Sequence, residues 1–556
     1  MKNASPLFPY RFLVAFMITG FMLIIRQQAQ ETITMDAYPE DIPFTMPDIV
    51  LPSFSDNTYD ITDFGASGNG QTLNTDAFEK AIETCHAAGG GTIIVPPGIW
   101  LTGPIRFMSN INLHVEKGAL VLFSREHKDY PIIQNPVNKS FMVSPPIYGF
   151  SLENIAITGE GILDGSGETW RPVKKMKTTE SQWKQLVASG GVVSNDGKIY
   201  WPTREAMEGE AYLENLKKKD KELLTEKDFE PARDFMRPYM VVFYQCSSVL
   251  FDGPTFRNSP KFILYPTFCQ DMVIRNIKVF NEWWAQNGDG IDLSGGKNIF
   301  IYNCLVSVGD DAICMKSSRS KNYDEETALQ NVVITACEVY HGHGGFVIGS
   351  NTDGGMRNIS VSNCTFISTD VGLRFKSSRG RGGLVENIYV RDIYMKDIMR
   401  EAILFNTFYD SPEEDRSVVF EVNEKTPRFQ KFHISNIYCN GASQAINISG
   451  LPEMPVRDIA FENITISASK GFESREAQTI ELTNVTINPD RGPLYYLDNS
   501  RDFSLKNITC PADNELFMKL NGKRTEHIRI IDTDLTAVKE AFSFGKEVNE
   551  KAVVME

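Results

Sequence analysis

Short segments in which apolar and polar residues alternate with a period of two recur along most of the chain. Each begins with a polar residue, usually Asn or Asp, and continues with Ile, Val or Phe at every second position. Such alternation predicts β-strands rather than helices, whose apolar positions recur every three or four residues. The clearest copies begin at Asn154, Asp271, Asn298, Asn331, Asn358 and Asn387, and further copies begin at Lys431, Asp458, Thr479 and Asp502.

The spacing of these segments predicts the fold. Between Asp271 and Asp502 the starting points lie 21 to 44 residues apart, and most separations fall in the twenties. A repeat of this length is typical of a solenoid with one coil per repeat, and the L-x-x-L-x-L frame of leucine-rich repeats is absent. We therefore expect an all-β protein, a single-domain right-handed parallel β-helix over residues 59–545, because a solenoid grows by adding coils.

The residues before the first repeat have a different pattern of apolar and polar positions. Residues 31–58 are predicted to form a leader that lies along the β-helix. A helix is predicted from Thr75 to Ala88, capped by Asn74 or Thr75 and ended by the glycines at 89–91. Its apolar face carries Ala77, Phe78, Ala81 and Ile82. A helix in this place would cover the open edge and the hydrophobic core of the first coil.

Residues 165–237 interrupt the repeat with a segment rich in charge, predicted to be largely helical from Thr203 to Glu226. Charged runs usually form solvated surface. The insertion also lies shortly before the acidic motifs of the chain, so a wall beside an active-site groove is the alternative. Both interpretations stay open at this point.

The first 30 residues predict an export signal. Lys2 and Arg11 precede an apolar run from Phe12 to Ile25 that is short for a membrane span. Residues 27–30 offer an imperfect cleavage site, and an uncleaved anchor is the alternative. We expect a mature protein without stable membrane insertion, in the periplasm or secreted.

Composition and cysteine usage limit the possible functions. The formal net charge is −15, and basic patches interleaved with aromatic residues are missing, so nucleic acid is not an expected partner. The chain has 9 cysteines, of which Cys304, Cys337 and Cys364 fall at one place in the repeat and are predicted to be stacked core residues. Cys and His lack metal-site spacing, so we expect neither a metal nor a cofactor, and a monomeric protein.

Three motifs carry the candidate chemistry: Asn287 to Asp292, Gly309 to Ala312, and Gly342 to Gly345. Asp289 and Asp310 lie 21 residues apart, so on a β-helix they would occupy neighbouring coils about 4.8 Å apart. Asp289, Asp310 and Asp311 are predicted to cluster as carboxylates for hydrolytic acid–base chemistry. Adjacent strand residues point to opposite faces, so Asp310 and Asp311 converge only if the chain turns near Gly309.

These residues resemble the family 28 glycoside hydrolases, which include polygalacturonases, and most of all the bacterial exo-acting members. The resemblance rests on four motifs in order: Asn-x-Asp-Gly at 287–290, Gly-Asp-Asp at 309–311, Gly-His-Gly at 342–344 and Arg-x-Lys at 374–376. It extends from Asp63-Phe64-Gly65-Ala66 to the last repeats and includes Arg237-Pro238 and Asn258-Ser259-Pro260. Two positions depart from the family pattern: Gly288, where Thr is commoner, and Lys261-Phe262, where many members have a Trp.

The resemblance implies roles for the acidic motifs. Asp310 would be the general acid, Asp289 and Asp311 would activate water, and His343 would tune the ionisation of Asp311. Inverting hydrolysis places about 6.5–9.5 Å between the acid and the base, which leaves room for water. Crowded carboxylates cannot all ionise easily, so we expect one raised pKa that supplies the protonated acid.

Basic residues downstream suggest how an acidic sugar is held. Arg374 and Lys376 alternate onto one side of a strand and are predicted to clamp a sugar carboxylate. With Arg379 and Arg381 they would form a basic strip on an acidic body. Tyr409 is a further candidate for stacking on the sugar or bonding to it.

The leading hypothesis is inverting hydrolysis of α-1,4-galacturonosyl linkages in pectin or oligogalacturonates, from a chain end. A rhamnogalacturonan hydrolase is the alternative within the family, and the pair Arg374 and Lys376 argues against it. A pectate lyase would need calcium-binding acids and a base on another face. A non-catalytic β-helix that binds carbohydrate would not need the acidic motifs or His343.

Overall fold

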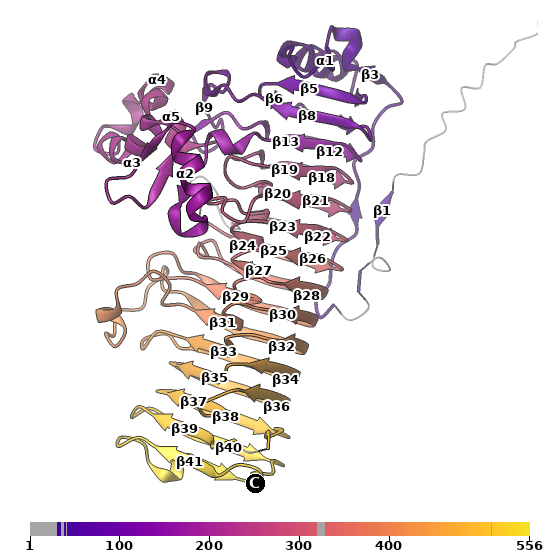
Figure 1. Cartoon of the computed structure of the whole chain (residues 1–556). Coiled ribbons are helices and arrows are strands. Elements are labelled where there is room, and N and C mark those ends of the chain that lie inside the picture. The colour runs from indigo at the N-terminus through magenta and orange to yellow at the C-terminus, as the bar shows by residue number, and fades with distance from the viewer. Residues whose placement is uncertain (1–30, 35–37, 40–41, 320–327, 513) are drawn as a thin grey trace, which may run out of the picture.

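Each alternating segment forms a strand that pairs in parallel with the same strand of the next coil. The computed structural model describes residues 31–34, 38–39, 42–319, 328–512 and 514–556. Over these residues the chain winds into a long parallel β-helix whose strands form a single 35-stranded sheet (Figure 1). No helix in the described ranges is long and apolar enough to cross a bilayer. The predicted signal peptide, residues 1–30, lies outside the described residues.

Three rows of strands run the length of the β-helix. The first row, which we call the site face, contains β6 (Ile105–Arg106), β11 (Ile147–Phe150), β17 (Val241–Tyr244), the start of β22 (Ile291–Tyr302), β24 (Asp311–Lys316), β27 (Gly344–Ile348), β29 (Leu373–Lys376), β31 (Glu401–Asn406), β33 (Gln444–Ser449), β35 (Lys470–Arg475), β37 (Tyr495–Asp498), β39 (Leu516–Asn521) and β41 (Glu540–Phe544).

The second row contains β3 (Thr58–Asp60), β4 (Gly91–Val95), β7 (Ile111–Val115), β12 (Glu153–Gly159), β18 (Ser247–Asp252), β20 (Thr267–Arg275), the end of β22, β25 (Leu329–Thr335), β28 (Met356–Ile367), β30 (Leu384–Lys396), β32 (Arg428–Asn440), β34 (Val456–Ala468), β36 (Ala477–Pro489), β38 (Arg501–Lys506), β40 (Glu526–Ile531) and β42 (Val553–Met555). The third row contains β5 (Gly98–Thr102), β8 (Ala119–Phe123), β13 (Ile162–Asp164), β19 (Thr255–Arg257), β21 (Lys278–Phe280), β23 (Leu305–Ser307) and β26 (Glu338–Tyr340), and continues as the ends of the long strands from β28 onward.

Stacked apolar side chains form the core, as the alternation predicted. In the second row, equivalent positions pair from coil to coil and are fully buried at Ile299, Val332, Ile359, Ile388 and Phe432. The three cysteines predicted to stack in the core, Cys304, Cys337 and Cys364, are buried and free. Because each coil covers the apolar residues of its neighbours, the core extends along the whole β-helix.

The polar residue that begins each repeat has a structural role. Asn298, Asn331, Asn358 and Asn387 all adopt the left-handed backbone conformation, with φ between 55° and 58°. Each donates its side-chain amide to the equivalent oxygen on the preceding coil, and the ladder begins at Asp271. Asn tolerates this conformation better than most residues, which explains its recurrence in the sequence.

The predicted N-terminal helix is α1 (Thr75–Ala87), and it covers the first coil (Figure 1). Its buried face contains the four predicted residues and Cys85, and it packs into the main core. The predicted cap is confirmed in its position but not in its side-chain hydrogen bond. Asn74 occupies the N-cap position, but its side-chain oxygen accepts from the backbone of Ser67, and the hydroxyl of Thr75 accepts from Gly103.

The leader segment lies along the outer side of the second row. Its strands β1 (Thr32–Ile33) and β2 (Ile49–Val50) pair with each other. Tyr38, Met46 and Leu51 bury against an apolar row on successive coils, formed by Ala156, Leu250, Val273, Phe300 and Val333. The leader therefore shields outward-facing apolar residues that the coils do not cover themselves.

Two segments project beside the N-terminal coils, on the side of the site face (Figure 1). The insertion contains α2 (Glu180–Ala188), α3 (Arg204–Leu216), α4 (Glu226–Phe229), α5 (Arg233–Met236) and a small sheet of β14 (Val173–Lys174), β15 (Val192–Val193) and β16 (Ile199–Trp201). The helix predicted from Thr203 to Glu226 is interrupted, because α3 ends at Leu216. The second segment is a hairpin of β9 (Ile132–Gln134) and β10 (Phe141–Val143).

Replacing Asn331 tests the ladder. Asn331→Ala removes two ladder hydrogen bonds and places a Cβ-bearing residue with no polar group in the left-handed conformation, so it should destabilise the protein by about 2–4 kcal/mol. Asn331→Gly loses the same bonds without the backbone strain and should be less destabilising. Thermal unfolding followed by circular dichroism measures both. Equal melting temperatures for Asn331→Ala and the native protein would contradict the role of the ladder.

Candidate active site

Strand register brings the acidic motifs together on the site face. β22 pairs with β24 so that Ile291 lies beside Ile313, and the backbone N–H of Gly290 donates to Asp311. Asp289 therefore aligns with Asp311, 22 residues on, and not with Asp310 as the 21-residue spacing had suggested. Asp310 precedes β24 and Asp311 is its first residue. The backbone therefore passes from a bend into a strand between Asp310 and Asp311. Such a change of backbone direction is what the two adjacent side chains needed in order to lie near each other.

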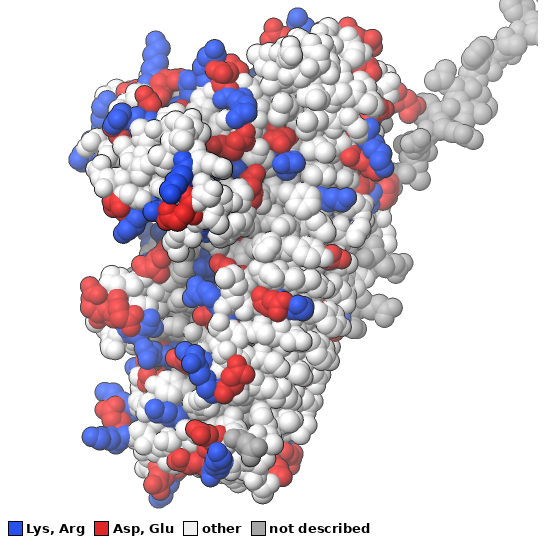
Figure 2. All heavy atoms as spheres, viewed as in Figure 1, with Lys and Arg blue, Asp and Glu red and all other residues white. Residues whose placement is uncertain are grey.

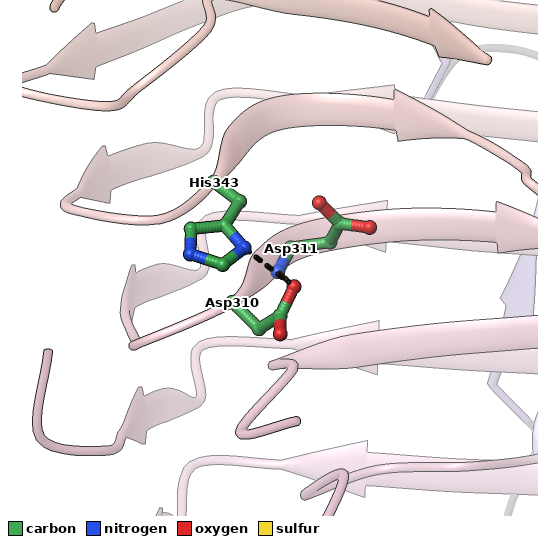
Figure 3. A group of neighbouring side chains, drawn as sticks. All are labelled: Asp310, Asp311 and His343. Atoms are coloured by element: carbon green, nitrogen blue, oxygen red, sulfur yellow. Dashed lines mark hydrogen bonds and ion pairs between the residues drawn. The ribbon is translucent and has the colours of Figure 1, made fainter. Parts of the chain in front are cut away.

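Asp310 contacts His343, which comes from the next coil. The Nδ1 atom of His343 lies 2.9 Å from Oδ1 of Asp310, whereas the carboxylate of Asp311 points away from the ring (Figure 3). His343 was expected to tune Asp311, but its direct partner is Asp310. Burial favours a higher pKa for Asp310; the hydrogen bond from His343 and nearby cations outweigh it and hold this pKa below its ordinary value.

The insertion supplies a lysine at the same place. The Nζ of Lys177 lies 3.2 Å from Nε2 of His343 and 3.2 Å from the carbonyl oxygen of Gly309. An ammonium group only donates, so Nε2 is the acceptor and Nδ1 carries the hydrogen that Asp310 accepts. Asp370 lies 3.8 Å from the same Nε2. The insertion is therefore a wall of the site, and Lys177 is a site residue that sequence reasoning missed.

Two cations from β29 hold Asp311. The guanidinium of Arg374 lies 3.0 Å from one carboxylate oxygen, and Nζ of Lys376 lies 2.7 Å from the other. Both side chains reach back across the intervening coil, and Arg374 passes Gly344, where a Cβ would lie 3.2 Å from the Arg374 side chain. Burial opposes ionisation of Asp311, but the charges of Lys376 and Arg374 outweigh it and bring its pKa well below the usual range. Asp311 is therefore ionised in the free protein.

A second acid pair shares one lysine. Nζ of Lys316 lies 3.2 Å from Asp289 and 2.5 Å from Asp292. Burial, reinforced by the charge of Asp292, raises the pKa of Asp289 well above its ordinary value, and burial raises the pKa of Asp292 to about 6. Crowding was expected to supply a protonated acid at Asp310. In the free protein the raised pKa belongs to Asp289 instead.

The other predicted binding residues divide into two groups. Tyr409 lies over the β29 cations, with its ring centroid 5.8 Å from Arg374 and 5.2 Å from Lys376. Arg379 instead forms an ion pair with Glu453 at 2.6 Å. Arg381 is exposed, and its guanidinium donates to Ser350. The predicted basic strip is therefore shorter than expected, because the charge of Arg379 is already paired.

The site lies in a groove on the face of the β-helix. Figure 2 shows Lys and Arg gathered in the hollow between the projecting insertion and the loop between β31 and β32. Over the coils that precede Asp310 lies a cavity of about 490 Å³. The β9–β10 hairpin borders this cavity on one side and Ser318 and Arg319 on the other, over a floor that includes Tyr244, Tyr265, Thr267 and Ser294.

Asp310, Asp311 and His343 have the donor types and mutual distances of a metal site, with ligand atoms within 4.8 Å of one another. Each oxygen of Asp311 is already paired with a cation, and His343 with Asp310. The local charge balance therefore does not require a metal ion.

Buried carboxylates in a groove on a parallel β-helix have the groups that acid–base cleavage of a glycosidic bond needs. The sequence model of glycosyl hydrolases family 28 matches residues 179–489, more than half of the chain. The protein belongs to this family and is a glycoside hydrolase.

Similar proteins cover most of the chain. The exo-poly-α-D-galacturonosidase of Dickeya chrysanthemi is 26% identical over 445 residues, which span 77% of this chain and 70% of that protein. A probable polygalacturonase of Vitis vinifera is 25% identical and covers 73% of each chain. The crystal structure of a hyperthermoactive exopolygalacturonase from Thermotoga maritima superposes with a TM-score of 0.63 and 29% identity, over 79% of this chain and 94% of that one.

Removing Lys316 tests the shared ion pair. Lys316→Met leaves two buried carboxylates without a cation, and breaking such a buried pair costs about 3–5 kcal/mol. The pKa of Asp292 is about 6 and would rise further without the lysine, so the loss should shrink as the pH falls and the carboxyls take up protons.

Melting temperatures at neutral and acidic pH measure this change, with Lys297→Met, at an exposed position of the preceding coil, as the matched control. An equal, small loss for both variants at every pH would show that Lys316 does not hold the acids.

Proposed function

We propose that this protein hydrolyses α-1,4-galacturonosyl linkages of polygalacturonate and oligogalacturonates, acting from a chain end. The pair of cations beside Asp311 is the observation that carries the substrate class. A guanidinium and an ammonium offer more donors than one carboxylate can use, so Arg374 and Lys376 can also bind a uronate on the leaving-group side. The named activities of similar proteins support the same substrate.

Asp310 is proposed as the general acid. It would give its proton to the glycosidic oxygen as the bond from that oxygen to C1 breaks, while a water oxygen bonds to C1 from the opposite face. Asp311 is ionised in the free protein and would accept the proton of that water. Asp289 lies one coil away and would orient the water with Asp311.

Substrate binding can supply the proton that Asp310 lacks in the free protein. A uronate bound to Arg374 and Lys376 adds a negative charge and draws these cations away from Asp311. Both effects raise the pKa of Asp310 and the basicity of Asp311. The acid and base would therefore reach their working states only when an acidic sugar is bound.

Stereochemistry is a separate part of the proposal. Oxygens of Asp310 and Asp311 approach within 4.8 Å, closer than the usual separation for inversion of about 6.5–9.5 Å. Inversion is favoured here by the family resemblance and by two further carboxylates available to hold water. Proton NMR of the first anomer formed tests this: a β-anomer indicates inversion, and an α-anomer contradicts it.

The N-terminal end of the groove supports action at a chain end. The hairpin lines a cavity there together with Tyr265 and Ser294, and this cavity has the volume of a small-ligand pocket. The insertion borders the groove at Asp310 and His343 through Lys177. A polymer that entered from the open C-terminal side would therefore find space for few sugars beyond the cleavage point.

Residues 59–545 would act as one catalytic domain with the insertion at 165–237. Export through the predicted signal at 1–30 would place the enzyme where pectic polymers occur.

Asp310→Asn should lower turnover of oligogalacturonates by about 10²–10⁴-fold, because the amide cannot protonate the leaving oxygen. The amide is isosteric, so the melting temperature and binding of trigalacturonate by calorimetry should change little. Near-native turnover in this variant would remove Asp310 from the acid role.

Early products test the chain-end proposal. The native enzyme should release galacturonate monomer from the start, with slow loss of polymer viscosity, and a ladder of oligomers at low conversion would contradict it. Gln134 pairs with Phe141 across the hairpin, so residues 135–140 can be replaced by Asn-Gly, a two-residue hairpin turn. This variant opens the cavity and should release longer products, provided circular dichroism shows native coils.

A further inference from the structure

Two cations flank Asp289 on the side away from Arg374 and Lys376. The backbone N–H of Ile263 donates to the carbonyl oxygen of Asp289, so the segment with Lys261 runs directly beside Asp289. Arg237 comes from the coil before and donates to the side chain of Asn287 and the carbonyl oxygen of Gln286. Both cations therefore lie next to the Asn-x-Asp-Gly motif.

Neither cation forms an ion pair among the residues that the structure describes. The hydrogen-bond partners of Arg237 are neutral, and its buried Nε has no partner. Nζ of Lys261 lies over the ring of Tyr239 at 4.5 Å. Burial, with the neighbouring charge of Arg237, lowers the pKa of Lys261 to about 8. A desolvated cation without a counter-ion is costly, so the structure maintains a place for an anion here.

The surroundings of the two cations have the character of a sugar subsite. Tyr239, Phe262 and Tyr265 form an aromatic cluster with ring centroids 4.5 to 5.3 Å apart, and all three are partly exposed. Tyr265 also lines the cavity at the end of the groove. Asp289 forms its ion pair with Lys316, and none with Lys261 or Arg237 in the described part of the chain. An anionic ring with one apolar face matches these groups.

The position of these two cations along the β-helix indicates which sugar of the substrate they would contact. Register places Lys261 two coils before Asp310, and Arg374 two coils after Asp311. Neighbouring coils lie about 4.8 Å apart, so the backbones at Lys261 and at Arg374 lie about 10 Å from the reacting acids along the β-helix, in opposite directions. If Arg374 and Lys376 bind the leaving-group sugar, the other pair faces the sugar on the opposite side of the scissile bond.

We propose that Lys261 and Arg237 form a carboxylate-binding subsite for the uronate on the glycone side of the bond that is cleaved. This inference rests on the proposed function and deepens it, because the enzyme would bind a sugar carboxylate on each side of the bond that is cleaved. Lys261 is the specificity-determining residue, since Arg237 also supports the loop before Asp289.

Two disaccharides test the subsite because they differ by a single carboxylate. Digalacturonate carries an acid on both units, whereas galactosyl-galacturonate lacks the acid on the glycone unit. Lys261→Met should raise KM for digalacturonate by about 10- to 100-fold, the range expected for loss of a charge-assisted contact, with kcat little changed. KM for galactosyl-galacturonate should change less than about threefold. Lys261→Arg should recover most of the affinity, and Lys297→Met is the matched control.

The outcomes separate this inference from the proposed function. An equal effect of Lys261→Met on both disaccharides would overturn the subsite while leaving galacturonan hydrolysis intact. A native enzyme that does not cleave digalacturonate or longer oligogalacturonates would overturn the proposed function itself. Calorimetry with Asp310→Asn gives a second readout: loss of the Lys261 ammonium should weaken digalacturonate binding and spare galactosyl-galacturonate.

The subsite also predicts a pH dependence. Lys261 is charged below a pKa of about 8, so KM of the native enzyme for digalacturonate should rise as the pH increases through this value. Arg237 and Tyr239, with pKa values of about 10 and 12, do not titrate there, and the paired Lys316 keeps its charge. Asp289 lies beside the same cations and can also change KM as the pH changes, so the pH dependence of KM is measured for the native protein and for Lys261→Met. The same rise in KM in both proteins would overturn the subsite.

Discussion

The ion pairs that join Asp311 to Arg374 and Lys376 are the contact on which the site depends. They span two coils, and Arg374 has room to reach Asp311 because Gly344, on the coil between, has no side chain. The cations keep Asp311 ionised in a buried place where a lone carboxylate would take up a proton. The same cations remain the natural partners of a sugar carboxylate. In the proposed mechanism, substrate recognition and the charge state of the base would therefore be coupled through one pair of side chains.

This coupling explains why the free protein does not show the ionisation states that hydrolysis needs. Asp310 has a lowered pKa, and the raised pKa values belong to Asp289 and Asp292. A uronate on either side of the bond adds negative charge beside Asp310 and shifts the balance toward its protonated form. Neutral sugars cannot do this. Selectivity for acidic polymers would then arise in the chemical step as well as in binding.

The repeat made the fold predictable because one pattern defines every coil, and the left-handed Asn positions mark where each begins. The site was predictable where a motif lies within a strand, as for Asp311 and Arg374. Lys316 carried a weaker signal, since it lies on the outward side of the strand that Asp311 begins. The contact between Lys177 and His343 joins residues 166 positions apart, and no local pattern encodes such a distance. The offset of 22 between Asp289 and Asp311 depends on connections whose length varies between coils.

The protein has a net negative charge and its proposed substrate is a polyanion. The charge inside the groove therefore has to be opposite in sign to that of the whole protein. The net charge of −15 opposes encounter at long range, but exposed charges are screened beyond about 8–10 Å at moderate ionic strength. Within the groove, Arg374 and Lys376 lie C-terminal to the reacting acids and Lys261 and Arg237 N-terminal to them. Each pair is less screened because it is partly buried. The acidic surface would therefore slow association in a way that depends on salt, while the buried cations would determine affinity under the proposed function.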